Sequence, residues 1–479
     1  MNKEQNAMNE KIEEVVLTNE QNAEAEAEMM PENKMGVKPV NPLLIGMSLP
    51  MMASMLVQAL YNIVDSIFVA KVSEHAVTGV SLAFPLQMLI IAVAGGTSVG
   101  VNAVLSKALG EKNQERVNKA ATNGIFIMAL SYVLFLLIGI FVVKPFFAMQ
   151  KMENPQIMEY GVTYLTICCV FSFGVFMQFI FERLLQSTGK TFYAMITQGI
   201  GAIVNLVLDP ILIFGLFGFP EMGIAGAAFA TVIGQVVAGL TAVILNQKFN
   251  SEVKVSFKKF RPDGKIIGKI YSVGFPSIIM QSIGSVMNYG FNQILLSFSD
   301  AAATAFGIYF KLQSFFFMPV FGLTNGLIPI LAFNYGARKK KRMIQALKLS
   351  ILYAEILLVS GMLCFLIFPH VLLGFFNPSQ ELLEIGSVAL RIISLSFPIA
   401  AFCIICGTMF QALGNGVYSM WVSVARQLAV LPPAAYLLSL TGNLSMVWFA
   451  FPIAEGASLL MTIIFMIRIN KKTLSKLED

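Results

Sequence analysis

Long apolar stretches follow one another along nearly the whole chain after residue 42. A run of about 20 apolar residues matches the hydrocarbon thickness of a bilayer, so few folds can accommodate many of them. Only 13% of the 479 residues are charged, against roughly 25% in soluble domains. The sequence therefore predicts an all-α polytopic membrane protein. We expect twelve spans, at approximately 43–70, 78–106, 119–143, 158–186, 190–217, 223–247, 266–298, 301–334, 343–369, 381–412, 415–440 and 443–468.

Lysine and arginine concentrate in alternate loops. They occur in 107–119, 248–269, 338–342 and 471–476, whereas the other loops are nearly bare of them. The positive-inside rule then places both termini in the cytoplasm, for a multi-pass protein of the cell membrane. The net charge of +6 therefore reflects membrane topology. It does not indicate a nucleic-acid partner, because the basic residues flank the spans.

The chain also contains an internal repeat. A shift of 226 residues superposes span 1 on span 7 and span 2 on span 8 without a gap. The matched pairs include Pro50 and Pro276, Asn62 and Asn288, Gly96 and Gly322, Gly100 and Gly326, Gly110 and Gly336, and Arg116 and Arg342. Parallel repeats of six spans are typical of transporters with a substrate path between two lobes. The alternative is a duplicated helical bundle that serves as an inert scaffold.

The repeat divides the chain into segments. We expect an acidic, disordered cytoplasmic tail at 1–41, an N-lobe at 42–247, a cytoplasmic linker at 248–265, a C-lobe at 266–469 and a second cytoplasmic tail at 470–479. The glycine pairs 96/100 and 322/326 have the spacing that lets two helices approach closely. We therefore expect them to be packing residues.

Two carboxylates in the N-lobe have no basic residue beside them. An ionised acid inside a span costs about 2.5–3.5 kcal/mol on insertion scales, and such groups usually have a function. Asp65 lies near the outer end of span 1, and Asp209 lies at a comparable height in span 5. The C-lobe differs, because its interior acids and bases can pair with one another or face a polar cavity. Its interior charges are Lys311, Glu355, Arg391, Arg426 and Glu455.

The residues around these two acids form polar helix faces. Gln58, Tyr61 and Asp65 are spaced i, i+3, i+7, and Asn205 and Asp209 are spaced i, i+4. The proline that follows Asp209 frees a backbone carbonyl. Such a cluster suits one proton or one small hard cation such as Na⁺, and two nearby acids in a low dielectric tend to share a proton. The alternative is that each acid only hydrogen-bonds a neighbouring helix.

Several segments closely resemble the MATE (multidrug and toxic compound extrusion) transporters, with the MepA-like and DinF-like bacterial branches nearest. The segments are QALYNIVDSIFVA, AGGTSVGVNAVLSKALGEKN, FERLLQSTGKTFYAMITQGIGAIVNLVLDPILIFG and GLTNGLIPILAFNYGARKK. The resemblance covers about residues 40–470. It implies a V-shaped bundle of twelve transmembrane helices in two pseudo-symmetric six-helix lobes. It also implies an antiporter, not an enzyme, that exports lipophilic and often cationic drugs in exchange for H⁺ or Na⁺ by alternating access.

The resemblance assigns roles to particular residues. It implies a cation-coupling site at Asp65, Asn205 and Asp209, lined by Gln58 and Tyr61, with Thr231 of span 6 as an assisting residue. The chain departs from the family at Glu182, where relatives often have asparagine; this acid either attracts cationic substrates or pairs with Arg183. Another branch keeps its cation site on acids of spans 7 and 10. Here span 7 has none, and Glu381 and Glu384 lie at the mouth of span 10.

Other features narrow the function. We expect Met177, Phe181 and Met287 to line the substrate cavity together with Glu182, because flexible methionines and broad aromatic faces suit varied lipophilic cations. GKT at 189–191 lacks the leading glycine of a phosphate-binding loop, so a gradient must drive transport. The chain has only two histidines, so we expect no metal site. We also expect no cofactor beyond H⁺ or Na⁺ as the coupling ion, and we expect the protein to be a monomer. The alternatives are a lipid-linked saccharide flippase and a membrane sensor or scaffold without transport.

Overall fold

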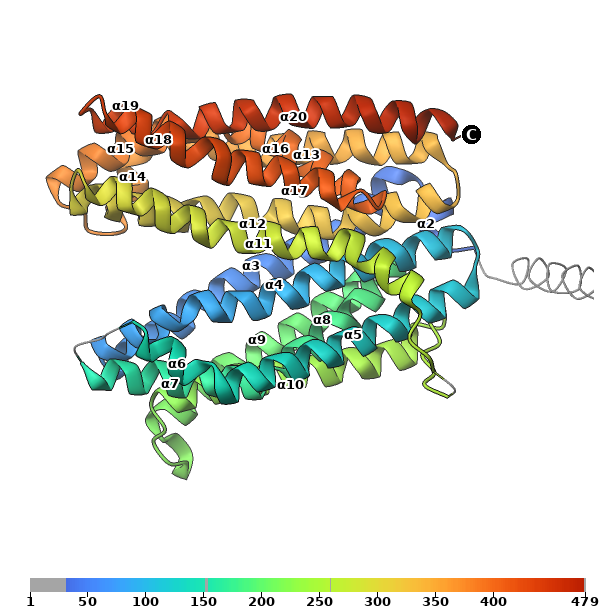
Figure 1. Cartoon of the computed structure of the whole chain (residues 1–479), viewed down its shortest axis with the longest axis horizontal. Helices are drawn as coiled ribbons and strands as arrows, with labels where there is room; N and C mark the ends of the chain where they lie inside the picture. Colours follow the sequence, from blue (N-terminus) through green and yellow to red (C-terminus); the bar gives the residue numbers. More distant parts are fainter. Residues whose placement is uncertain (1–31, 151–153, 259, 478–479) are drawn as a thin grey trace, which may run out of the picture.

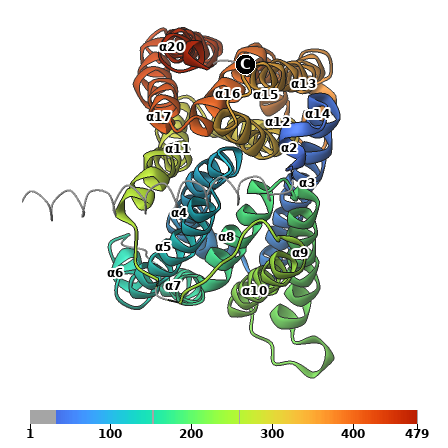
Figure 2. The same ribbon diagram turned by 90° about the vertical axis from the view of Figure 1, so that its right-hand side faces the viewer.

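The computed structural model describes residues 32–150, 154–258 and 260–477, and every regular element in these ranges is a helix. Helices α3 to α10 form the N-lobe and α11 to α20 form the C-lobe (Figures 1 and 2). The N-lobe helices are α3 Val40–Val72, α4 Glu74–Gly110, α5 Gln114–Phe141, α6 Val143–Ala148, α7 Pro155–Val170, α8 Phe173–Ser187, α9 Thr191–Phe214 and α10 Ile224–Phe249. The C-lobe helices are α11 Gly264–Leu296, α12 Asp300–Gly336, α13 Lys340–Ile367, α14 Pro369–Gly374, α15 Gln380–Ser394, α16 Phe397–Ala412, α17 Gly416–Val424, η2 Ala425–Val430, α18 Leu431–Ser439, α19 Leu444–Val447 and α20 Ala450–Lys472.

The prediction of a polytopic helical membrane protein is confirmed. Nine helices of the described ranges are long and apolar enough to cross a membrane, and two bent pairs raise the number to eleven. The remaining expected span, 415–440, is divided among α17, η2 and α18, which follow one another without a gap.

Two expected spans are bent and not straight. The span at 158–186 consists of α7 and α8 at 46°, and the span at 381–412 consists of α15 and α16 at 47°. Pro398 at the start of α16 has no backbone N–H to continue the preceding helix, which explains the second break. A proline inside a long apolar stretch is compatible with either outcome, so the sequence alone did not indicate the bend.

Glycine residues let the two lobes pack backbone to backbone. A Cβ atom on Gly100 of α4 would lie 2.1 Å from the carbonyl oxygen of Ile270 in α11. At the matching place in the repeat, a Cβ atom on Gly326 of α12 would lie 2.8 Å from Cα of Ser48 in α3. The predicted packing role of the two glycine pairs is therefore confirmed, because no other residue could occupy these crossings without separating the helices.

The lobes meet at one end of the molecule. We call this the basic end, because the basic loops 107–119, 248–269 and 338–342 all lie there. Helix α4 is buried almost continuously from Ala92 to Gly110, and α12 from Pro319 to Asn334, whereas the first halves of both helices are largely exposed or half-buried. The lobes are thus in contact in the basic half and diverge toward the opposite end.

Regular structure is already present before the expected boundary at residue 41. Lys34–Val37 form the short helix α2, and α3 already begins at Val40. Asn33 caps α2 by accepting a hydrogen bond from the backbone N–H of Met35. The rest of the expected acidic tail, residues 1–31, lies outside the described residues.

Candidate functional site

The structure brings the two lone acids of the N-lobe together. Asp65 projects from α3 and Asp209 from α9, and their carboxyl groups are within hydrogen-bonding reach of each other. Asp65 Oδ1 and Asp209 Oδ2 are nevertheless buried without a donor from the described residues. Two carboxylates are both acceptors, so one proton or one small cation held between them would satisfy both.

Asn205 and Thr231 complete this site from α9 and α10. The Asn205 Nδ2 group donates to Asp209 Oδ1 and to Thr231 Oγ1, each at 3.4 Å. Asn205 Oδ1 is buried and accepts no hydrogen bond from the described residues. Asp209 is fully buried and Asn205 is 4% exposed, so these oxygens line a buried site. The helix faces predicted from the i, i+4 spacing therefore converge in the structure.

Two tyrosines adjoin the acids. Tyr61 lies beside Asp65 and hydrogen-bonds Gln58 on the same helix. Tyr164 of α7 lies close enough to both Asp65 and Tyr61 to interact electrostatically, and its hydroxyl accepts from Gln87 Nε2 of α4 at 3.1 Å. The sequence reasoning missed Tyr164 and Gln87. A signal existed for Gln87, because a glutamine recurs at the matching place in the repeat.

Glu182 has three neutral donors and no ion-pair partner within the described residues. Its Oε1 accepts from Gln178 Nε2 at 3.0 Å and from Thr197 Oγ1 at 2.9 Å, and its Oε2 accepts from Gln198 Nε2 at 2.8 Å. Arg183 points away and donates instead to Asn325 Oδ1 of α12 at 3.0 Å. Glu182 and Arg183 form no ion pair with each other within the described residues, although their charges are near enough to interact, so both alternatives for Glu182 stay predictions. Glu182 is thus a buried acid whose hydrogen-bond donors are all neutral side chains.

The expected cavity residues lie in different surroundings. Met177 packs against Gly239 of α10, and the carbonyl oxygen of Phe181 accepts from Asn246 Nδ2 at 2.8 Å. Both side chains are half-buried on α8, the helix that carries Glu182. Met287 is only 7% exposed and belongs to the apolar core. It offers little surface to a substrate in this conformation.

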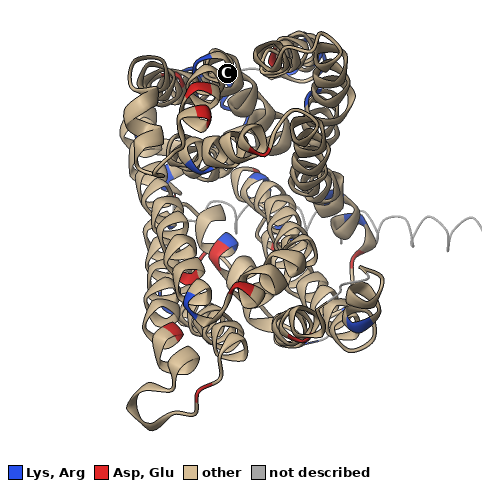
Figure 3. Cartoon of the chain, turned by 90° about the vertical axis from the view of Figure 1, so that its left-hand side faces the viewer, with Lys and Arg blue, Asp and Glu red and all other residues tan. Residues whose placement is uncertain are grey.

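The C-lobe satisfies part of its charge internally, as expected. Arg426 Nη1 and Glu455 Oε1 form an ion pair at 3.0 Å, and Arg426 lies in the π-helical segment η2. Arg391 is exposed and donates to the carbonyl oxygen of Leu366, and Lys311 is exposed on α12. Figure 3, seen from the end opposite the basic end, shows how few charged residues the helices carry. Within the described residues no three His, Cys, Asp or Glu side chains gather as metal ligands.

Comparison with known families supports the internal repeat. The model of the MatE family matches the chain twice, at residues 50–211 and at residues 276–437. The two matches have equal lengths and are offset by the same 226 residues that relate the repeats in the sequence.

Curated relatives and solved structures extend this likeness to the whole chain. Multidrug export protein MepA of Staphylococcus haemolyticus (strain JCSC1435) is 26% identical over 435 residues, covering 90% of this chain and 94% of that protein. Its namesake of Staphylococcus aureus (strain MSSA476) is 25% identical over 437 residues, with the same coverage. A multidrug resistance MATE family transporter solved in an outward-facing conformation matches with a TM-score of 0.86 at 23% identity, covering 93% of this chain and 99% of that one. A MOP superfamily transporter from Pyrococcus furiosus has a TM-score of 0.86 at 22% identity, covering 92% and 98%. At these identities the structural matches establish the fold.

Proposed function

The chain belongs to the MATE family of multidrug efflux transporters, and from that premise we propose that it exports lipophilic, often cationic compounds in exchange for H⁺ or Na⁺. The observation that carries the exchange is the pair of facing carboxyls, Asp65 and Asp209. They come from two helices of one lobe and leave buried acceptor oxygens without a donor among the described residues. A proton or a small cation is the ligand that such a pair binds best.

Binding of that cation would favour one arrangement of α3 against α9. Asp65 belongs to α3, which packs across the lobe boundary on α12, whereas Asp209 belongs to α9 inside the N-lobe. A cation held between the two carboxyls therefore changes the free energy of moving α3, and with it the contact between the lobes. A ligand can shift a conformational equilibrium only by its difference in affinity for the two states. Coupling follows if substrate and cation favour opposite states.

The orientation of the chain completes the proposal. We place the basic end in the cytoplasm of a cell whose plasma membrane holds the protein, in keeping with the positive-inside rule. The present conformation is then open toward the outside, because the lobes are in contact at the basic end. In that state the Asp65–Asp209 site can receive a cation from outside, and the substrate path between the lobes is closed to the cytoplasm.

Glu182 is the residue that we assign to the cationic part of the substrate. Its carboxylate accepts hydrogen bonds only from neutral side chains, so a cationic group of the substrate would be its ion-pair partner. Met177 and Phe181 on the same helix would supply adaptable apolar contacts. Because Glu182 is 4% exposed here, we expect it to become accessible in the state that opens to the cytoplasm.

Transport into inside-out vesicles tests this function. A fluorescent lipophilic cation is offered with an imposed pH gradient or an imposed Na⁺ gradient, and uptake is compared among wild type, Asp65→Asn and Asp209→Asn. We expect uptake in wild type and none in either variant, with normal amounts of folded protein; the productive gradient identifies the coupling ion. Equal uptake by the variants would show that these acids do not couple transport. A flippase or a sensor would show no uptake under either gradient.

A further inference from the structure

Residues 33–38 form a clasp that joins the two lobes at the basic end. Its first residue binds the N-lobe side: Asn33 Nδ2 donates to the carbonyl oxygen of Thr188 at 3.2 Å and to Glu252 Oε1 at 2.6 Å. Its later carbonyls bind the C-lobe: Gly36 accepts from Lys339 Nζ at 2.8 Å, and Lys38 accepts from Arg342 Nη2 at 2.6 Å. The lobes cannot separate at this end without breaking one of these two sets of bonds.

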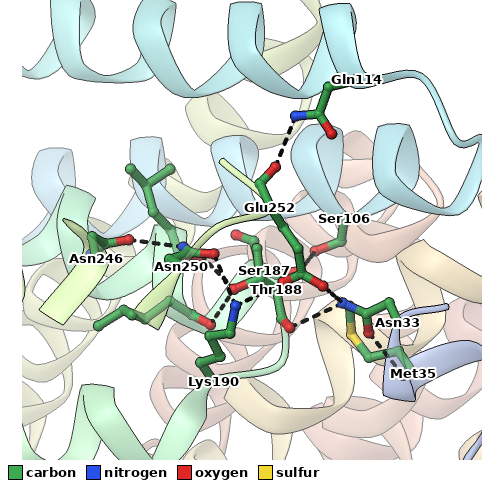
Figure 4. A network of polar contacts seen from close by, with 12 residues as sticks. Asn33, Met35, Ser106, Gln114, Ser187, Thr188, Lys190, Asn246, Asn250 and Glu252 are labelled. Carbon is green, nitrogen blue, oxygen red and sulfur yellow. Dashed lines mark hydrogen bonds and ion pairs between the residues drawn. The ribbon is translucent and has the colours of Figure 1, made fainter. Parts of the chain in front are cut away.

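A polar network anchors the N-lobe side of the clasp (Figure 4). Glu252 lies at its centre, between Asn33 and Lys190, whose ammonium group is 3.0 Å from Glu252 Oε2. Gln114 Nε2 donates to the backbone carbonyl of Glu252 at 2.9 Å. The linker that follows α10 is thus fastened to α5, to the loop after α8 and to the clasp.

A cavity of about 780 Å³ opens beside the clasp. Its walls come from both lobes: Leu109–Lys112 at the end of α4, Ser251–Lys254 of the linker, and Phe333–Lys339 at the end of α12. Glu32 and Asn33 also line it, so the chain enters the described structure at the rim of this cavity. The volume is within the range of ligand sites in proteins, about 300–1,000 Å³. Because both lobes contribute, the cavity exists only while the basic end is closed.

Three cations on the wall have no bonding partner. The side chains of Lys112, Lys254 and Arg338 form no hydrogen bond or ion pair within the described residues. Two of the three acids of the wall are already engaged, Glu111 by Arg116 and Glu252 by Lys190, and the third is Glu32 at the rim. We call Lys112, Lys254 and Arg338 the cationic rim. All three residues are exposed, so their positive charge is accessible to an anionic partner.

The backbone of the cationic rim is strained in a repeated way. Lys112 and Arg338 are related by the 226-residue repeat, and both have positive φ, 54° and 57°. A left-handed conformation is unfavourable for a residue with a Cβ atom, and glycine would avoid this strain. Each lobe thus holds a strained cationic residue at the same cavity, and strain of this kind commonly marks a functional position.

The charged groups around helix α2 also favour an anionic partner at this end of the molecule. Helix α2 lies outside the membrane-spanning helices, and partial burial together with the neighbouring cations Lys38 and Lys190 lowers the pKa of Lys34. Positive charge is therefore crowded at this end of the molecule. An acidic segment that approached it would relieve this repulsion.

We propose that the acidic segment at residues 4–28 of this same chain docks on the cationic rim and reinforces the closed basic end. Residues 1–31 contain eight glutamates and two lysines, the opposite of the basic residues that flank the spans on this side. These residues lie outside the described part of the chain. The proposal rests on their negative charge and on their attachment to the chain at the cationic rim. An anionic membrane surface repels such a segment, whereas the cationic rim attracts it.

Attachment makes this docking intramolecular. A short tether gives an effective concentration in the millimolar range, so even weak ion pairs are populated. Because the cavity needs both lobes, a docked segment stabilises the closed basic end and slows its opening. The segment is thus a brake on the transport cycle that ionic strength can release. The proposal goes beyond the transport function and does not depend on the coupling ion.

Cross-linking tests the docking directly. In a background with the five native cysteines replaced by alanine, Glu26→Cys is paired with Lys254→Cys, and the control pair is Glu26→Cys with Lys472→Cys at the same end of the molecule. We expect the first pair to cross-link at least fivefold faster than the control. The double substitution Lys112→Gln with Arg338→Gln should abolish this difference in cross-linking rate. High salt should abolish it too, because the Debye length falls from about 10 Å at 0.1 M to about 3 Å at 1 M. Equal rates for the two pairs, or rates that the rim substitutions do not alter, would overturn the proposal.

A conformational measurement separates docking from its effect. Spin labels at Glu115 of α5 and Gln345 of α13, both exposed, report the distance between the lobes by electron–electron resonance. Neutralising Glu24, Glu26 and Glu28 to glutamine should raise the population with separated lobes at least twofold, whereas Lys471→Gln with Lys472→Gln should not. A reversed-charge pair of variants, glutamates to lysine and rim cations to glutamate, should restore the closed population. If vesicles containing anionic lipid alone close the basic end of the tail-neutralised protein, a lipid headgroup occupies the rim and the proposal is wrong.

Discussion

Alanine at Gly336 should separate the two lobes at the basic end. A Cβ atom there would lie 2.1 Å from the carbonyl oxygen of Lys107, and the matching Cβ on Gly110 would lie 2.0 Å from the carbonyl oxygen of Phe333. Ordinary contacts of a Cβ atom begin near 3.4 Å. The obstructing atoms belong to helix backbone, so no side-chain rotation can relieve the overlap, and one helix must move away from the other.

The size of the effect follows from overpacking. An extra carbon in a well-packed contact typically costs 1–3 kcal/mol. This cost falls on the closed basic end alone, because the contact is absent when the lobes separate. A destabilisation of that size changes the ratio of closed to open states by about 5- to 150-fold. Gly110→Ala should act similarly, since the internal repeat makes the two contacts equivalent.

The distance between spin labels at Glu115 and Gln345 measures this shift. We expect Gly336→Ala to move population from the short to the long distance, and Gly456→Ala, where no atom lies within 4 Å of the added Cβ, to leave the distribution unchanged. If Gly336→Ala keeps the distribution of wild type while the protein is folded, then the glycine crossing does not hold the lobes together. The explanation of the closed basic end would then be wrong.

Three further outcomes follow from single contacts. Arg342→Gln should weaken the clasp by about 1.5–3 kcal/mol for the lost charged hydrogen bonds and accelerate amide exchange at residues 34–40, whereas unchanged exchange would show that the clasp holds without it. Glu455→Gln should destabilise the C-lobe by about 2–4 kcal/mol. This is less than the roughly 3–5 kcal/mol for breaking a fully buried ion pair, because Arg426 keeps 24% of its side chain exposed. In thermal unfolding, the double variant Glu455→Gln with Arg426→Gln should be more stable than Glu455→Gln alone. Glu182→Gln should weaken binding of a cationic substrate about tenfold, a loss of roughly 1.4 kcal/mol, and leave a neutral substrate unaffected; equal weakening of both would assign Glu182 a structural role.

Most of the architecture was predictable because the membrane imposes strong rules. The apolar spans and the 226-residue repeat indicated two six-span lobes, and the structure and the family matches confirm them. Asp65 and Asp209 could be paired because a charge inside a span is rare and needs a partner. Their helix faces followed from i, i+4 spacing, which is a local property of the sequence.

The features that escaped prediction depend on tertiary contacts. Tyr164 joins the acid cluster only because α7 packs beside α4, and an apolar span with two tyrosines, Tyr160 and Tyr164, carries no sign of which one faces the acids. Arg183 donates a hydrogen bond to Asn325 of the other lobe. The adjacent acid Glu182 was the more obvious partner in the sequence, so this contact was not predicted. Met287 packs in the apolar core, and the sequence of α11 does not distinguish its core face from a cavity face. The clasp was missed because a polar segment before the first span has no periodicity to interpret.

The most direct test of the Asp65–Asp209 site separates coupling from transport. Purified wild type, Asp65→Asn and Asp209→Asn are reconstituted in liposomes, and each is assayed for substrate accumulation driven by a cation gradient and for exchange of labelled against unlabelled substrate without any gradient. If the acids bind the coupling cation, both variants keep exchange within a few-fold of wild type and lose accumulation. If accumulation persists in the variants, or exchange and accumulation fall together in folded protein, the two carboxyls do not serve as the coupling site.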